Sequence, residues 1–325
     1  MKAAVNASYG PPDVLQIRDV PKPEPDTGEV LIRVYTTTVS RTDDGMLRPR
    51  PFIARLFIGL LKPKLTILGM DFAGKVEKVG PGVNAFKQGD LVFGMSANTY
   101  GAHAEYLCIH ENGPVAIMPK DTGFDEAVVC EGAWYANNCL RKLELAPGQK
   151  ILIYGGSGAI GSAAIQLAKS YGAEVTAVVH ARHTELVKSL GADHVIDYTA
   201  EDFTKTDETF DCVLDAVGKT TFFRCRKLLK ASGVFAATDL GPWAQNAFLA
   251  IWSRLAGKGR VVFPLPGGAS KFVDFMKTRM EAGEIHAVID RYYSLDTIKD
   301  AYRYVATEQK TGIVVINITP VEMSG

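Results

Sequence analysis

The chain has 325 residues, a length that indicates about two domains. Hydrophobic residues make up 47% of the chain and charged residues 22%, which excludes collagen-like, disulfide-rich and wholly disordered proteins. The 36 basic and 36 acidic side chains cancel, so no overall positive field attracts nucleic acid, and we expect no nucleic-acid partner.

The five cysteines form no Cys-x-x-Cys pair, and their odd number indicates reduced thiols in a reducing compartment. The residues after Met1 lack the apolar core of a secretory signal. Residues 151–168 contain 18 uncharged residues, but the four glycines among them would break a membrane-spanning helix. We therefore expect a cytoplasmic protein.

Short apolar runs separated by turn residues fill the chain up to about residue 120. The runs at 30–34, 72–79, 91–93 and 104–109 predict antiparallel strands, arranged as a barrel.

From Lys150 onward predicted strands alternate with predicted helices, which is typical of parallel crossover units in a doubly wound sheet. After residue 266 we expect a helix at 270–282 and a last strand at 313–318. In the alternating part the predicted strands are 151–154, 174–179, 195–196, 212–214, 234–236 and 260–263, and the predicted helices are 159–171, 184–190 and 220–230.

A glycine pattern, Gly156-x-Gly158-x-x-Gly161, follows the first of these strands and begins a helix. Gly156 permits a tight turn, Gly158 lets the backbone approach a pyrophosphate, and Gly161 lets helix and strand pack closely. The free N–H groups of the helix N-terminus bind the anion. The sequence therefore predicts a dinucleotide site formed by Gly156, Ser157, Gly158, Ala159, Ile160 and Gly161.

The end of the second strand favours NADPH over NADH, although NADH stays open. An acid here would bind the ribose 2′-hydroxyl of NAD, but residues 175–184 contain none. Arg182, with His180 and His183, could instead hold a 2′-phosphate through charge-assisted hydrogen bonds. The alternative is that Arg182 is a solvated residue at a strand end.

Several further motifs make the chain resemble the medium-chain dehydrogenase/reductase superfamily, in its zinc-free branch of quinone and enone oxidoreductases. The resemblance covers nearly the whole chain. Besides the glycine loop, it rests on the sequences at 39–43, 68–74, 79–80, 89–90, 190–198 and 312–315. It implies an α/β fold in which a Rossmann domain (122–266), a doubly wound parallel sheet, is inserted in a GroES-like, mainly antiparallel β-barrel catalytic domain (1–121 and 267–325). Substrate would lie between these domains.

The zinc-ligand positions of metal-dependent relatives are changed in this sequence. Ser40 stands at the first cysteine position, Met70-Asp71 at the His-Glu position, and Glu131 near the third. A catalytic zinc needs about three nitrogen, sulfur or carboxylate ligands, which Ser40 and Met70 do not supply. We expect no metal, and we interpret Asp71 and Glu131 either as acids that perturb each other's pKa or as structural carboxylates.

Without a metal, the easiest substrates are small, apolar and already electrophilic: quinones and α,β-unsaturated carbonyl compounds. We therefore expect an NADPH-dependent reductase of such compounds. The alternatives are an NADPH-binding sensor or interaction protein with little turnover and, third, a zinc alcohol dehydrogenase.

The resemblance places Arg41, Thr42 and Asp43 beside the nicotinamide end of the cofactor. Thr42 is either a hydrogen-bond donor to a substrate carbonyl or a helix cap. Arg41 either reaches the pyrophosphate or forms a surface ion pair. Tyr135 could donate to a developing oxyanion or be a core aromatic.

Further cofactor contacts are expected at the carboxyl ends of the predicted strands, where ligands bind in open α/β sheets. Tyr198 matches a position that commonly lies against the adenine, with a plain strand-end aromatic as the alternative. The remaining candidates are Ala216, Val217, Leu240 and Phe263.

Residues 48–64 carry five positive charges and no negative one around an apolar core. We favour a lid over the substrate, with Phe52, Leu56, Phe57 and Leu60 facing it, over a contact with anionic lipid. The resemblance also implies a homodimer, with apolar surface at 243–255 and 261–263.

Overall fold

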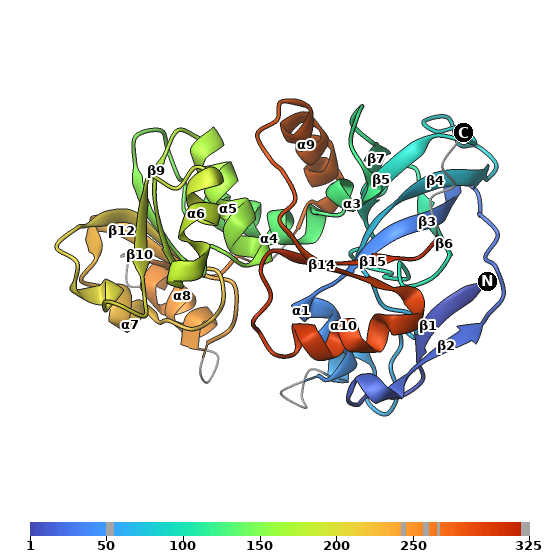
Figure 1. Ribbon diagram of the computed structural model, residues 1–325, viewed down its shortest axis with the longest axis horizontal. Coiled ribbons are helices and arrows are strands. Elements are labelled where there is room, and N and C mark those ends of the chain that lie inside the picture. Colours follow the sequence, from blue (N-terminus) through green and yellow to red (C-terminus); the bar gives the residue numbers. More distant parts are fainter. Residues whose placement is uncertain (50–54, 242–244, 256–259, 265–266, 320–325) are drawn as a thin grey trace. The chain divides into compact units, whose positions relative to one another are not determined.

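The computed structural model describes residues 1–49, 55–241, 245–255, 260–264 and 267–319 (Figure 1). The chain forms two compact units, Met1–Glu131 with Gly268–Gly325, and Gly132–Gly267. The first division lies later than the expected residue 121, because helix α3 (Phe124–Ala127) packs on the sheet of the first unit. There the ring of Phe124 stacks on Tyr35, with 4.7 Å between the ring centroids.

The second unit contains a six-stranded, all-parallel sheet with the order β10-β9-β8-β11-β12-β13. This is the order of a Rossmann sheet, and the strand order reverses between β8 and β11, next to the expected dinucleotide loop. The doubly wound fold is thereby confirmed. The strands are β8 (Lys150–Tyr154), β9 (Glu174–Val179), β10 (His194–Asp197), β11 (Phe210–Asp215), β12 (Leu229–Ala237) and β13 (Val261–Val262).

Helices pack against the strands of this sheet (Figure 1). Helix α5 contacts β8 and β9, α6 contacts β10, α7 contacts β12 and α8 contacts β13. The core between them is aliphatic and aromatic, with Leu152, Phe210 and Phe235 almost without exposed surface. The helices are α4 (Cys130–Lys142), which begins in the first unit, α5 (Ala159–Ser170), α6 (Thr184–Ser189), α7 (Phe222–Cys225) and α8 (Gln245–Leu255).

The predicted helix at 220–230 is wrong over most of its length. Helix α7 is capped by Thr221 and ends at Cys225, and β12 already begins at Leu229. Leu229 pairs with Phe210 of β11, and the Lys230 ammonium lies 2.7 Å from the Asp211 carboxylate. Pairing with a distant strand therefore outweighs the local helical pattern.

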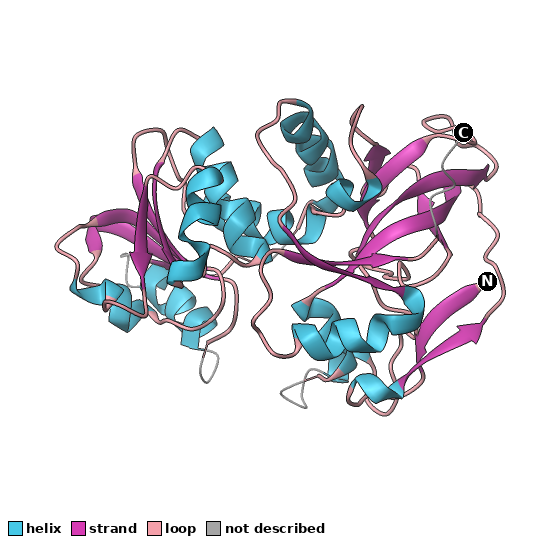
Figure 2. Ribbon diagram, viewed as in Figure 1, coloured by secondary structure: helices cyan, strands magenta, loops and turns pink. Residues whose placement is uncertain are grey.

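The first unit contains a seven-stranded sheet with the order β14-β15-β3-β4-β5-β7, and β6 also pairs with β3 (Figure 2). All pairs are antiparallel except β14 with β15, which confirms the antiparallel prediction. The strands are β3 (Glu29–Val39), β4 (Asp71–Val79), β5 (Leu91–Met95), β6 (Tyr106–His110), β7 (Val115–Ile117), β14 (Ile289–Ser294) and β15 (Ile313–Asn317), and β1 (Lys2–Asn6) and β2 (Leu15–Asp19) form a separate antiparallel pair.

Residues from both ends of the chain build the core of this unit. Leu15, Leu47 and Leu68 pack with Tyr302 of the C-terminal part of this unit, and all four are buried. The helices here are α1 (Arg41–Leu47), α2 (Arg55–Ile58), α3, α9 (Ala269–Glu281) and α10 (Ile298–Val305). Within the described ranges of both units, every helix is too short or too polar to cross a membrane.

Candidate active site

The glycine loop between β8 and α5 has the form that a pyrophosphate requires. A Cβ atom on Gly161 would lie 2.1 Å from the carbonyl oxygen of Gly155, so only glycine lets helix and loop approach this closely. A Cβ on Gly158 would meet nothing nearer than 3.7 Å, which leaves open space above the loop. Gly158 caps α5 without a side-chain hydrogen bond, so the first N–H groups of the helix can bind an anion.

A second loop, after β11, lies against the glycine loop. The backbone N–H of Ala216 donates to the carbonyl of Tyr154 at 3.0 Å, and a Cβ on Gly155 would lie 2.5 Å from Cγ1 of Val217. The buried Asp215 carboxylate accepts from the N–H groups of Val217, Gly218 and Thr220 at 2.9–3.1 Å. Ala216 and Val217 are therefore beside the loop as expected, and sequence reasoning missed Asp215, which holds them there.

The four residues expected around the adenosine end lie near one another. Nδ1 of His180 accepts from the backbone N–H of Arg182 at 3.2 Å, and Nε of Arg182 donates to Nε2 of His183 at 3.0 Å. The His180 ring meets the edge of Tyr198, with 6.1 Å between the centroids. The half-buried imidazoles of His180 and His183 thus lie with the exposed Arg182 guanidinium and the exposed Tyr198 phenol in one polar group.

One acid, Asp197, lies close to this group, but it is already hydrogen-bonded within its own turn. The Asp197 carboxylate accepts from the hydroxyl and N–H of Thr199 and from the N–H of Ala181. These hydrogen bonds hold the pKa of Asp197 below its ordinary value.

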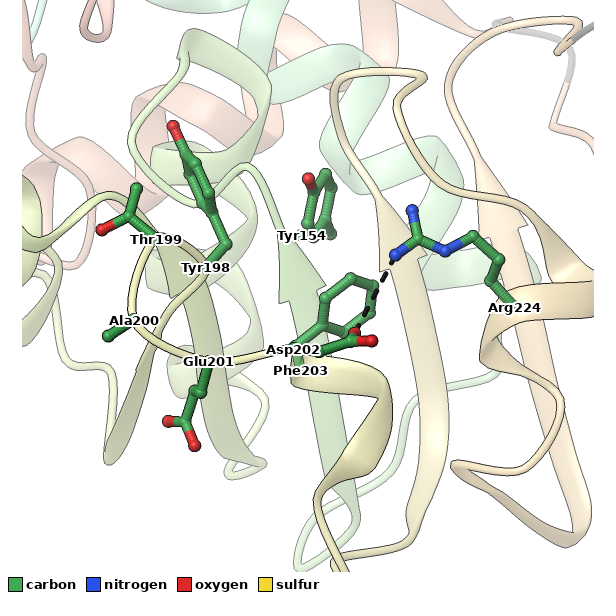
Figure 3. A pocket seen from close by; sticks show the side chains of 8 residues that line it. All are labelled: Tyr154, Tyr198, Thr199, Ala200, Glu201, Asp202, Phe203 and Arg224. Atoms are coloured by element: carbon green, nitrogen blue, oxygen red, sulfur yellow. Dashed lines mark ion pairs between the residues drawn. The ribbon is translucent and has the colours of Figure 1, made fainter.

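A pocket of about 340 Å³ lies at the carboxyl ends of β8 and β10 (Figure 3). The Tyr154 and Phe203 rings are 4.9 Å apart, and the Arg224 guanidinium lies 3.9 Å from Asp202 across the pocket. Tyr198 stands at the rim with 49% of its surface exposed. The pocket offers aromatic faces and one cation to a flat, polar ring system. Sequence reasoning found Tyr198 alone, although an aromatic directly before the glycine loop, Tyr154, was a usable signal.

Two expected cofactor residues lie elsewhere in the sheet. Leu240 follows β12 and Phe263 follows β13, which are two and three strands away from β8 in the sheet order. The structure therefore does not group these residues with the glycine loop. Tyr135 lies half-buried on α4 with its ring tilted against Trp134, 5.5 Å between centroids.

In the first unit, Asp43 completes the capping box at the start of helix α1. Its Oδ2 accepts from the backbone N–H and the hydroxyl of Ser40, both at 2.9 Å, and its Oδ1 accepts from the N–H of Gly69 at 3.0 Å. Burial raises its pKa to about 6. Asp43 therefore joins α1 to the segment before β4, a positioning role, and Ser40, not Thr42, is the N-cap.

Glu131 lies next to Asp71, and both are buried. Burial, and then the neighbouring Asp43 charge, raise the pKa of Glu131 to about 7, while hydrogen bonds with Thr42 and Ser40 act in the opposite direction. Burial, and then the Glu131 charge, raise the pKa of Asp71 well above its ordinary value. The Oε2 atom of Glu131 has no hydrogen-bond partner among the described residues.

Two cations, Lys310 and Arg41 of α1, belong to the same region as Glu131. Burial lowers the pKa of Lys310 to about 8, against the attraction of Glu131. Arg41 forms an ion pair with Glu308 at 3.2 Å. Of the two roles expected for Arg41, this is the surface ion pair. Sequence reasoning missed Lys310, because nothing near it in the sequence marks it as a neighbour of Glu131.

The side chains here do not fit a zinc ion. Ser40 is engaged by Asp43, Met70 is buried, and Oδ1 of Asp71 accepts from the N–H of Glu131 at 2.9 Å. His103 donates through Nε2 to the carbonyl of Thr38 at 2.8 Å, and burial lowers its pKa to about 4. In the part of the chain that the structure describes, no three His, Cys, Asp or Glu side chains are placed to hold a metal.

Comparison with known proteins identifies the family to which this fold belongs. A family model described as the alcohol dehydrogenase GroES-like domain matches residues 26–136, and one described as zinc-binding dehydrogenase matches residues 190–316. The solved structure of the quinone oxidoreductase from Coxiella burnetii superposes with a TM-score of 0.87 at 26% identity, covering 98% of this chain and 99% of that one.

Two curated relatives carry names of reductases. The 2-methylene-furan-3-one reductase of Solanum lycopersicum is 34% identical over 98% of this chain and 80% of its own. The chloroplastic NADPH-dependent alkenal/one oxidoreductase of Arabidopsis thaliana is 31% identical over 98% and 80%. The chain therefore belongs to the medium-chain dehydrogenase/reductase superfamily, in its zinc-free branch of quinone and enone oxidoreductases, and is an oxidoreductase that uses a nicotinamide cofactor.

Proposed function

We propose that the protein is an NADPH-dependent reductase of quinones or α,β-unsaturated carbonyl compounds that works without zinc. The observation that carries the proposal is the set of side chains around Glu131. Thr42 and Ser40 hydrogen-bond its carboxyl group, and the buried Asp71 lies beside it. This set can hold and move a proton, but it is a poor set of ligands for a Lewis acid.

The substrate class follows from what the site can stabilise. A bound nicotinamide supplies a hydride. Without a metal, the charge that develops on the substrate oxygen must be stabilised by hydrogen bonds. Hydrogen bonds are sufficient for a quinone or an enone, which is already electrophilic, more readily than for an unactivated ketone. In our proposal Thr42 donates to that oxygen, and Glu131, which holds a proton near neutral pH, restores the proton of Thr42.

The choice of NADPH rests on the group formed by His180, Arg182 and His183. Its exposed donors suit a 2′-phosphate, and the nearest acid, Asp197, is already bonded within its turn. The name of the Arabidopsis relative, an NADPH-dependent enzyme, supports the same choice. We further propose that the enzyme is a cytoplasmic homodimer; its five free cysteines support a reducing compartment.

The test is a panel of quinones and short enones, each assayed for oxidation of NADPH and of NADH, with the zinc content measured on the same preparation. We expect turnover of at least one class, faster with NADPH, and less than one zinc per chain. Binding of NADPH without turnover of any compound would instead favour a sensor. Activity that is lost with a chelator and restored by zinc would contradict the metal-free proposal.

A further inference from the structure

The segment 55–64, called here the leucine–lysine loop, exposes apolar and basic side chains together. Leu56, Leu60 and Leu61 have 60%, 50% and 87% of their surface exposed. Lys62 and Lys64 beside them are also exposed. Large apolar side chains this open, and adjacent in sequence, indicate a contact surface rather than part of the core.

The backbone of this loop is held in place. The Tyr9 hydroxyl donates to the carbonyls of Ile58 and Gly59 at 2.9 and 2.8 Å, and the N–H of Lys64 donates to Ile58 at 2.9 Å. Gly59 has a φ of +120°, and a Cβ there would lie 2.0 Å from the carbonyl oxygen of Lys62. The exposed leucines are therefore presented by a closed turn that is tied to the N-terminal segment.

The sequence segment that contains the loop carries charge of one sign. Between Asp44 and Asp71 the sequence has five basic residues and no acid, although the chain as a whole has no net charge. Arg48 is paired with Asp44, and the Arg55 guanidinium lies over the Tyr9 ring at 4.6 Å. In the sequence, the exposed Lys62 and Lys64 directly follow the leucines, and residues 45–70 contain no acid.

We propose that the leucine–lysine loop docks on the surface of an anionic lipid bilayer. Leu60 and Leu61 enter the boundary between headgroups and acyl chains, and Lys62 and Lys64 contact lipid phosphates. A lid over an apolar substrate, which the sequence favours, would bring these ammonium groups against an apolar molecule, at a cost in desolvation. Lipid phosphates accept the same groups without that cost. Such a contact would give the reductase access to apolar substrates dissolved in a membrane.

Vesicle flotation of the full chain tests the proposal. The vesicles contain phosphatidylcholine with about 30% phosphatidylserine, or phosphatidylcholine alone, at low and high salt. We expect the protein to float with the anionic vesicles at low salt and to stay unbound with neutral vesicles or at high salt. Leu61→Ser and Lys62→Glu/Lys64→Glu should each lower the partition coefficient about tenfold or more.

Matched controls distinguish binding through the loop from non-specific adsorption of the protein to vesicles. Leu91→Ser changes another exposed leucine of the same unit, and Lys75→Glu/Lys87→Glu makes the same charge change on exposed lysines elsewhere. Both should float like the wild type, and circular dichroism should show that all variants are folded. Absence of flotation in the wild type, or equal loss in the controls, would overturn the proposal. So would an unchanged flotation of Leu61→Ser together with a raised KM for long-chain enones, because that result assigns the loop to a lid.

Discussion

The backbone N–H of Glu131 donates to Oδ1 of Asp71 at 2.9 Å, so two buried carboxyl groups are held side by side at the start of β4 and of α4. Burial, with the Glu131 charge acting on Asp71 and the Asp43 charge acting on Glu131, keeps protons on this pair at pH values where exposed acids have lost theirs. A residue that stays protonated near neutral pH, and that Thr42 contacts, is suited to proton transfer in the reductase that we propose.

The first prediction concerns stability and pH. The folded protein holds a proton on Glu131 up to pH about 7, whereas the unfolded chain loses it near 4.5, so stability contributed by this group is lost as the pH rises from 4.5 to 7. Glu131→Gln removes that loss. The unfolding free energy of the variant, relative to wild type, should rise by roughly 1–3 kcal/mol over this range, as measured by urea denaturation. Glu126→Gln is the control, and a constant difference between variant and wild type would contradict the prediction.

The second prediction compares two glycines of one loop. Gly161→Ala places a methyl group 2.1 Å from the carbonyl oxygen of Gly155 and should lower stability by about 1–3 kcal/mol. Gly158→Ala meets no atom within 3.7 Å and should keep the melting temperature, but its methyl group occupies the space for the pyrophosphate. We expect NADPH affinity to fall about tenfold or more in isothermal titration. Equal effects of the two variants on stability would argue against this geometry.

The third prediction tests the choice of nucleotide. Arg182→Ala should lower kcat/KM for NADPH about 10- to 100-fold, because one charge-assisted contact is lost, and should change kcat/KM for NADH little. Lys188→Ala removes the same charge on α6 and is the control. Tyr198→Ala should weaken both nucleotides alike, because the adenine is common to them. Equal loss with both nucleotides for Arg182→Ala would place this guanidinium away from the 2′-phosphate.

The fourth prediction concerns proton donation. Thr42→Val removes the hydroxyl that contacts Glu131 and should lower kcat about 10- to 100-fold with an enone substrate. Thr42→Ser keeps a hydroxyl and should retain most of the activity. Because the proposed relay ends at Glu131, the pH profile of kcat should lose its limb near pH 7 in Glu131→Gln. A fully active Thr42→Val enzyme would leave water as the donor.

The fifth prediction concerns the expected homodimer. Helix α8 exposes Phe248, Ile251, Trp252 and Leu255 at 61–80% of their surface, at the spacing of one helix face, beside the last strand of the parallel sheet. Ile251→Ser/Trp252→Ser should shift the sedimentation coefficient from dimer to monomer. Phe223→Ser, an exposed aromatic on α7, should not. A monomeric wild-type protein would end the dimer proposal.

Local sequence signals were sufficient to predict the structure wherever residues that are close in the chain are also close in space. The glycine loop, β9 at 174–179 and the helix that begins at Ala159 follow from spacing and turn chemistry over a few residues, and the structure has all three where the pattern puts them. The doubly wound order follows from alternation of strands and helices in the same way.

Only the tertiary structure decided what distant residues do to one another. It ended the helix expected at 220–230 by pairing Leu229 with Phe210, and it moved the unit boundary beyond residue 121 by packing α3 on the antiparallel sheet. It also brought Lys310 close to Glu131, although 179 positions separate them in the sequence. Burial and long-range charge set these outcomes, and neither can be read from a short window of sequence.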